Sequence, residues 1–143
     1  MLEVARTQLS DLSNVTIQKE DCAHTSFPSE SFDTVLMVNL IHVMDDALPC
    51  LRESYRILRS GGLLIVVDFT GYRLDLSKTV RQVWRYVRRW GLPRRNEKHD
   101  LSPEELGRLV ERAGFKVKDV QLLQDGSNAI VLRGLKCAKL PFT

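Results

Sequence analysis

Long apolar runs, paired cysteines and a leader-like start are all missing from this 143-residue chain. No segment approaches the roughly 18 to 20 uninterrupted apolar residues that a bilayer span needs, and no basic-then-apolar stretch opens the chain. Both absences predict a cytoplasmic protein. Cys22, Cys50 and Cys137 include no C-x-x-C pair, so we expect no zinc site and no disulfide framework, but reduced structural thiols.

Net charge is also small, at +3, and it favours no particular class of partner. A composition of 43% hydrophobic and 27% charged residues is typical of one domain with its own core. The basic residues are concentrated, however. Eight lysines and arginines lie between Lys78 and Lys98, where Glu97 is the only acidic residue.

The centre of the chain reads as strand, helix, strand. Phe32–Val38 and Gly61–Phe69 are continuous apolar runs, the pattern of parallel strands that are buried on both faces. Between them, residues 45–59 have helical spacing, with Asp45 or Asp46 as the cap and Gly61 as the stop. We expect a crossover unit of a doubly wound α/β sheet. The helix should bury one stripe and expose the other, namely Leu48, Leu51, Tyr55 and Leu58 against Arg52, Glu53, Arg56 and Arg59.

Further elements flank this unit. Residues 1–12 have helical spacing without a preceding cap, and Val15–Gln18 reads as a short strand. Ser102-Pro103-Glu104-Glu105 is a helix start with a capping box. Residues 116–123 and 128–135 then form an antiparallel pair of strands around an Asp-Gly turn.

The order of short motifs resembles a known family. The motifs are Asp21-Cys22, Phe27-Pro28, Ser31-Phe32-Asp33, Leu40-Ile41-His42 and Arg59-Ser60-Gly61-Gly62. Together they resemble the class I S-adenosylmethionine-dependent methyltransferases, in particular the small-molecule group that includes quinone-biosynthesis enzymes. The resemblance covers residues 1 to about 135 and implies a Rossmann-like sheet with helices on both faces and an antiparallel C-terminal strand. Residues 1–136 would form the methyltransferase domain and 137–143 a tail.

The same resemblance implies a site for S-adenosylmethionine. Asp21 matches the carboxylate that accepts a hydrogen bond from the adenine amino group, and Cys22 the backbone N–H that meets the ring. Val38 and Asn39 match the strand end whose backbone contacts the methionine part. The alternative interpretation of Asp21 is a loop residue or a helix cap.

The sequence departs from the family pattern in several places. Glu20 replaces a glycine, Ser26 a proline and Val43 a second histidine. No two of the eight glycines are two residues apart, so the family's glycine-rich turn and the N-terminal strands around it have no counterpart. The chain therefore resembles the C-terminal part of such a domain. The strand at Phe32–Val38 would then have an open edge. We expect a chain that is poorly stable alone, is completed by a partner or a second copy, or is a part of a longer protein.

Candidate residues for the acceptor side follow the strand ends. His42 is the best placed general base for a methyl acceptor, with a packed histidine at a helix start as the alternative reading. Asp68 ends the second strand, and Tyr72 lies in the irregular sequence after it. We assign none of them a catalytic role from the sequence.

The basic segment, residues 72–100, has three interpretations. Arg85, Arg88 and Arg89 alternate with aromatic residues, a pattern that would suit nucleic acid or an anionic membrane. An amphipathic cover over the substrate pocket with a solvated basic face is the favoured alternative. The whole chain is interpreted as a methyltransferase for a small-molecule acceptor, or else as a non-catalytic methyltransferase-like interaction module.

Overall fold

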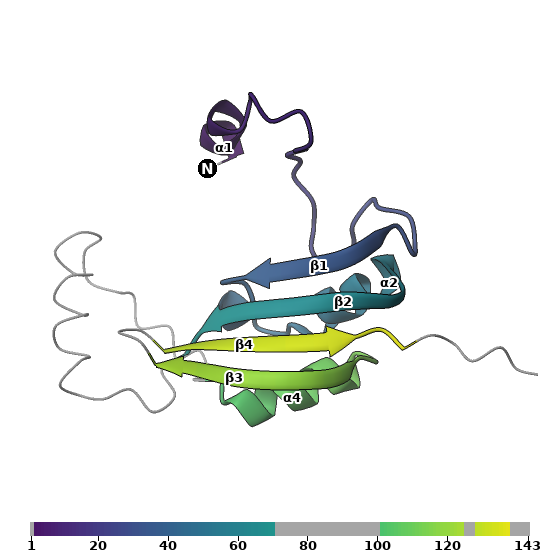
Figure 1. The fold of residues 1–143 in the computed structure, drawn as a ribbon, viewed down its shortest axis with the longest axis vertical. Helices are drawn as coiled ribbons and strands as arrows, with labels where there is room; N and C mark the ends of the chain where they lie inside the picture. Colours follow the sequence, from purple (N-terminus) through teal and green to yellow (C-terminus); the bar gives the residue numbers. More distant parts are fainter. Residues whose placement is uncertain (1, 71–100, 125–127, 138–143) are drawn as a thin grey trace, which may run out of the picture.

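The computed structural model describes residues 2–70, 101–124 and 128–137 (Figure 1). The basic segment with Arg85, Arg88 and Arg89, together with Tyr72 and the Asp-Gly turn, lies outside the described residues. Within the described part, no helix has the length and apolar character that crossing a membrane requires.

The described residues form an α/β fold around a mixed sheet of four strands in the order β1-β2-β4-β3 (Figure 1). These strands are β1 (Phe32–Val38), β2 (Leu58–Phe69), β3 (Lys116–Gln124) and β4 (Asn128–Leu135). β1 and β2 are parallel, whereas β4 runs antiparallel to both β2 and β3. The predicted parallel pairing and the predicted antiparallel C-terminal pair are both confirmed, but the predicted burial on both faces is wrong for β1, which is largely exposed on one face.

Two helices cover one face of this sheet. They are α2 (Leu48–Ile57) and α4 (Pro103–Arg112), both behind the strands in Figure 1. Helices on both faces were expected, so the described part shows half of that arrangement. Inward-facing side chains of the helices and strands form a single core, including the fully buried Leu51, Leu58, Leu64, Val66, Leu106, Val110, Ile130 and Leu132.

The ends of α2 differ from the prediction. The helix is shorter than residues 45–59, and it ends at Ile57 because Leu58 already has extended backbone angles. Gly61 is therefore not the helix stop. It lies inside β2 with φ +80°, in an irregular stretch where Gly62 leaves no room for a Cβ beside the Arg59 carbonyl oxygen, 2.8 Å away. The two glycines allow an irregularity within β2, and they do not end α2.

One position of α2 that was predicted to be exposed is buried in the structure. Glu53 was placed on the solvent side with Arg52, but it is buried, with 9% of its surface exposed. The reason is that the loop before β1 lies against this side of α2 and supplies donors to the Glu53 carboxylate. Periodicity within one helix cannot register a contact made by a distant loop.

α4 begins as its sequence predicts. The Ser102 side chain accepts from the Glu105 amide at 3.2 Å, and the Glu105 carboxylate accepts from the Ser102 amide at 2.9 Å. This is the predicted capping box, with Pro103 at the first helical position. Gly114, at φ +105°, follows the helix end as predicted.

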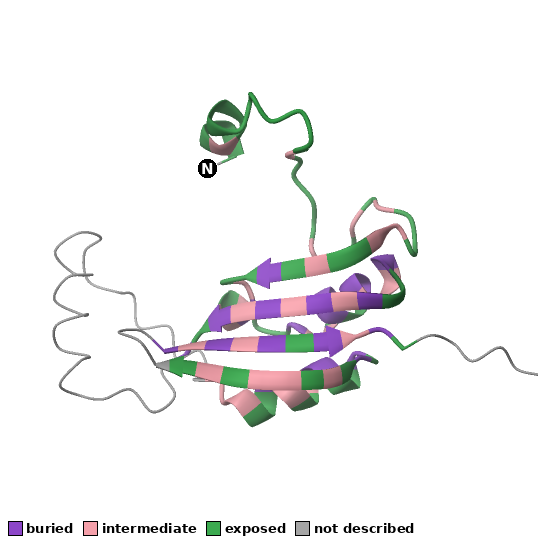
Figure 2. Ribbon diagram, viewed as in Figure 1, coloured by how far each residue is buried: buried purple, intermediate pink, exposed green. Residues whose placement is uncertain are grey.

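The N-terminal part is less packed than predicted. α1 (Leu2–Gln8) has no buried residue and stands away from the sheet in Figure 1. Val15–Gln18 is not a strand, because no described strand lies beside it to accept its backbone hydrogen bonds. The sheet face opposite α2 and α4 is correspondingly open: Leu36 and Val38 are 59% and 52% exposed (Figure 2).

Candidate functional site

Polar groups converge where the parallel strands β1 and β2 end. β1 ends at Val38, and the next residue, Asn39, has the left-handed backbone angle φ 53°. Its amide donates to the Val67 carbonyl oxygen at 2.9 Å, so the chain turns away from the sheet directly after that bond. Positive φ at a non-glycine residue is uncommon and often marks a functional site. The carboxyl ends of parallel strands are also where α/β sheets bind ligands.

His42 and Asp68 meet at this edge. His42 lies in the short 3-10 helix η1 (Ile41–Val43), and Asp68 is the penultimate residue of β2. The Asp68 carboxylate accepts from the backbone amides of Ile41 at 2.6 Å and of His42 at 3.2 Å, and it pairs with Nδ1 of the His42 ring. Asp68 is buried at 3% exposure, whereas 35% of the His42 side chain is exposed. A buried carboxylate thus holds an accessible imidazole in one orientation.

His42 is one of the residues that line a pocket of about 150 Å³ between η1, the start of α2 and the segment leading into α4. Most of its wall is apolar, from Ile41, Met44, Ala47, Leu101 and Leu109, and its polar members are His42, Asp45 and Asp46. Because Nδ1 is engaged with Asp68, Nε2 is the ring nitrogen available to a ligand here. The pocket can therefore hold a small, largely apolar molecule beside a proton acceptor.

Asp21 and Cys22 lie on a different element, the loop from Glu20 to Ser31. One oxygen of the Asp21 carboxylate accepts from the Ala23 amide at 2.9 Å, and the Asp21 side of the loop is exposed. Cys22 is half-buried and packs against the core next to Cys50 of α2. Burial, and a hydrogen bond with the Cys22 thiol, raise the pKa of Cys50 to about 12.

The structure thus brings together two of the predicted residues, His42 and Asp68, in direct contact. It places Val38 and Asn39 at the end of β1, next to η1, while Asp21 is bound within its own loop. Tyr72 lies outside the described residues. In the described ranges 2–70, 101–124 and 128–137, no group of three or more His, Cys, Asp or Glu side chains is arranged to hold a metal ion.

Sequence reasoning missed several members of the site. Met44, Leu101 and Leu109 line the pocket but carried no signal apart from being apolar. Leu101 and Leu109 are about sixty residues from His42 along the chain, so only the fold brings them together. The pairing of His42 with Asp68 had a usable signal, because each follows or ends one of two adjacent parallel strands.

Comparison with known proteins gives one consistent result. A family model described as a methyltransferase domain matches residues 1–66 of this chain. The chain is 28% identical to a demethylmenaquinone methyltransferase from Tropheryma whipplei, over 94% of this chain and 62% of that protein. It is also 28% identical to a ubiquinone/menaquinone biosynthesis C-methyltransferase from a Shewanella species, over 91% of this chain and 58% of that protein. The chain therefore spans about three fifths of the length of these curated relatives.

Solved structures agree with the sequence relatives. A SAM-dependent methyltransferase from Thermotoga maritima superposes with a TM-score of 0.68 at 29% identity, over 95% of this chain and 69% of that one. Another from Aquifex aeolicus superposes with a TM-score of 0.69 at 19% identity, over 94% of this chain and 63% of that one. At the lower identity the likeness shows the fold alone.

Proposed function

Because this chain belongs to the class I S-adenosylmethionine-dependent methyltransferases, in the small-molecule group with distant homology to quinone C-methyltransferases, we propose that it takes part in methyl transfer to a small apolar acceptor. In this proposal His42 is the general base, and Asp68 is the residue that holds it. The observation that carries the proposal is the contact between the buried Asp68 carboxylate and Nδ1 of the accessible His42 ring.

Asp68 supports a base in two ways. Its carboxylate favours the proton on Nδ1, which leaves the lone pair of Nε2 for a ligand. It also binds the amides of Ile41 and His42, so the ring and the backbone that carries it are fixed by one group. Nε2 then accepts a proton from a hydroxyl group of the acceptor, which raises the electron density of the atom to be methylated. Positioned proton transfer of this kind contributes about 10² to 10⁴ in rate.

The pocket favours an acceptor that is mostly apolar. Its apolar wall includes Met44, Leu101 and Leu109, and His42 is among its polar residues. An aromatic ring bearing an ionisable hydroxyl, such as a hydroquinone, combines both properties. This class also agrees with the names of the relatives, which are quinone-pathway methyltransferases.

The residues of the Glu20–Ser31 loop and of the β1 end fit one side of S-adenosylmethionine. Asp21 is exposed and uses one carboxylate oxygen within the loop, so the other can accept from an adenine amino group. Asn39 has already given its amide to Val67, so its carbonyl oxygen and side chain are the groups left for the methionine part. When bound, the cofactor supplies the electrophilic methyl group.

The test is transfer of a labelled methyl group from S-adenosylmethionine to a panel of apolar hydroquinones. We expect labelled product with the wild-type chain and a loss of about 10² to 10⁴ in rate for His42→Gln. Transfer that His42→Gln leaves unchanged would contradict the role of His42. No transfer to any hydroquinone would contradict the acceptor class.

A second candidate function is a non-catalytic methyltransferase-like module that binds another chain. Its supporting observation is the edge position of β1, which in the described sheet has a neighbour on one side only, together with the exposed Leu36 and Val38. An apolar strand edge of this kind invites pairing with another strand. Affinity for S-adenosylhomocysteine separates the two candidates, since only the first requires it.

A further inference from the structure

The loop before β1 is bound to α2 along its length. It runs beside the helix in the same direction: Cys22 lies next to Cys50, Thr25 binds Glu53, and Ser29 binds Arg56. At its end, the amides of Glu30 and Ser31 donate to the carbonyl oxygens of Arg56 and Ile57, at 3.0 and 2.8 Å. The loop is therefore held in register with the helix, although most of its own residues are exposed.

Glu53 is the central residue of this contact. Its Oε1 accepts from the amide of Thr25 at 2.9 Å and from the Thr25 hydroxyl at 2.7 Å. The same carboxylate binds the Arg56 guanidinium through both oxygens, at 2.6 and 2.9 Å. These donors, the Arg56 guanidinium first, lower the pKa of Glu53 to about 2, so the carboxylate is charged at neutral pH.

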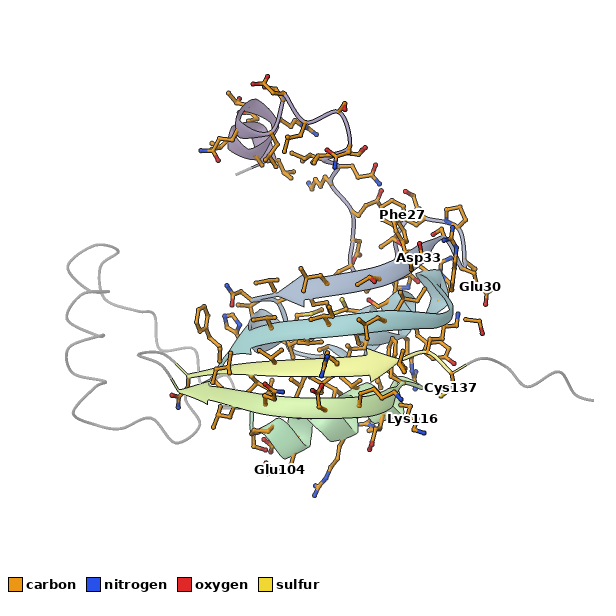
Figure 3. All side chains as sticks on the ribbon, in the orientation of Figure 1. Phe27, Glu30, Asp33, Glu104, Lys116 and Cys137 are labelled. Atoms are coloured by element: carbon orange, nitrogen blue, oxygen red, sulfur yellow. The ribbon has the colours of Figure 1, made fainter. Side chains whose placement is uncertain are left out.

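Arg56 extends the contact beyond Thr25. Its Nη2 donates to the Phe27 carbonyl oxygen at 2.7 Å, and its Nη1 donates to the Ser29 hydroxyl at 3.1 Å. The Phe27 ring packs edge-on against Phe32 at the start of β1, with ring centroids 4.9 Å apart. Figure 3 shows Phe27 and Glu30 at the end of the sheet where β1 begins.

A second carboxylate, that of Glu20, binds Ser26 within the same loop. Glu20 accepts from the Ser26 amide at 3.0 Å and from the Ser26 hydroxyl at 2.7 Å. Hydrogen bonds thus lead from Glu53 to Thr25, and then from the adjacent Ser26 back to Glu20, the neighbour of Asp21. Glu20 and Ser26 are also two of the positions where this sequence departs from the family pattern. Here the two departures bind each other, and the Ser26 amide that forms the bond would be missing from a proline.

We propose that Glu53 and Arg56 are positioning residues of the cofactor site, which hold the Glu20–Ser31 loop on α2 and thereby fix the Asp21 carboxylate. The inference rests on the proposed function, because Asp21 matters only if the loop binds the adenine. It goes further in giving a part in cofactor affinity to two helix residues that are not among those lining the acceptor pocket.

Amide hydrogen exchange tests the positioning itself and needs no cofactor. In Glu53→Gln, the hydrogen-bonded loop amides, those of Ala23, His24, Thr25 and Ser26, should exchange about tenfold faster, because a charge-assisted set of bonds is lost, while the amides of β2 and β4 keep their wild-type rates. The matched control is Glu111→Gln, which removes an exposed carboxylate from α4. Loop exchange that stays at the wild-type rate would overturn the proposal.

A milder variant tests the same contact if Glu53→Gln also destabilises or unfolds the protein. Thr25→Val removes the hydroxyl bond to Glu53 from the loop side and leaves α2 intact. We expect loop exchange to rise about threefold, in line with the loss of one bond, with unchanged exchange in β2. No rise in this variant, when Glu53→Gln has unfolded, would count against the proposal.

Calorimetry then tests the link to the cofactor. S-adenosylhomocysteine should bind Glu53→Gln about tenfold more weakly than wild type, while an analogue with oxygen in place of the adenine amino group should bind both equally. Equal S-adenosylhomocysteine affinity despite faster loop exchange would overturn the role in the cofactor site. If wild type binds no S-adenosylhomocysteine, the proposed function fails, and the exchange rates alone decide whether Glu53 positions the loop.

Discussion

The Asp68 carboxylate pairs with the ring of His42 and also accepts from the amide of the same residue. A single buried group on β2 therefore sets the imidazole orientation and the backbone of η1, across the end of the neighbouring strand. This relationship links the fold to the proposed chemistry, because the order of β1 and β2 is what brings the two residues within reach.

Replacing Asp68 should change the His42 tautomer. We expect Asp68→Asn to abolish the preference for a proton on Nδ1, since the neutral amide no longer stabilises it, and to slow methyl transfer about 10-fold to 10²-fold. Nitrogen-15 chemical shifts of the ring report the tautomer directly. Thermal unfolding should show a loss of stability, because the buried Ile41 amide and the part-buried His42 amide lose a charged acceptor.

Asp33→Asn is the matched control for this substitution. Asp33 is an exposed carboxylate at the opposite end of the strands, labelled in Figure 3, where it pairs with Arg59 on the surface. Its replacement should leave the His42 shifts and the transfer rate unchanged. Identical His42 shifts in wild type and Asp68→Asn would show that the carboxylate does not set the tautomer.

The lowered pKa of Glu53 predicts that its contribution to the free energy of unfolding is lost in acid. Its pKa is lowered from 4.5 to about 2, first by the hydrogen bonds from Arg56, so the folded state binds the proton more weakly than the unfolded state. The stabilisation is then fully present above about pH 4.5 and is lost as the pH falls towards 2. We expect the free energies of unfolding of wild type and Glu53→Gln to differ most near pH 6 and to converge only as the pH falls to about 2. A constant difference across this range would contradict the account.

The three thiols should react at very different rates. Burial raises the pKa of Cys50 to about 12, so almost no thiolate forms at pH 8, while Cys137 is exposed and Cys22 is half-buried. A disulfide reagent should modify Cys137 first, Cys22 more slowly, and Cys50 only on unfolding. Mass spectrometry of digested samples identifies the order, with a guanidinium-unfolded sample as the control. Early labelling of Cys50 would show that the core around α2 opens readily.

The edge of β1 predicts self-association. β3, at the other edge of the described sheet, carries Lys116 and Lys118, whereas β1 presents Leu36 and Val38. Charges on an edge strand oppose pairing, so β1 is the edge at risk. Light scattering after size-exclusion chromatography should show concentration-dependent association that Leu36→Lys reduces. Leu123→Lys, at an exposed position of β3, is the control, and a stable monomer with a cooperative melt would refute the prediction.

Sequence patterns that depend on near neighbours predicted the structure well. The capping box of Ser102 and Glu105, the apolar run of β1 and the antiparallel C-terminal pair are all present, because each depends on residues within a few positions or one turn. The strand expected at Val15–Gln18 failed because a strand needs a partner, which local sequence cannot supply. Likewise, the burial of Glu53 depends on Thr25, 28 residues away.

The candidate site also has members that the sequence predicted and members that it did not. The family resemblance predicted Asp21 and Asn39, and the strand ends predicted His42 and Asp68; of these four, His42 and Asp68 are in contact. The pocket wall from Leu101 and Leu109 could not be predicted, because apolar residues on a helix face carry no mark of what they pack against. The roles of Glu20 and Ser26 were equally hidden, since each departure from the family pattern makes sense only beside the other.

The most direct test of the account is an isothermal titration of the 143-residue chain with S-adenosylhomocysteine. We expect saturable binding with one site per chain, and weaker binding for Asp21→Asn, which replaces the exposed carboxylate with a neutral amide. The absence of measurable heat for wild type, in a sample whose thermal melt is cooperative, would contradict a cofactor site and favour the non-catalytic interaction module.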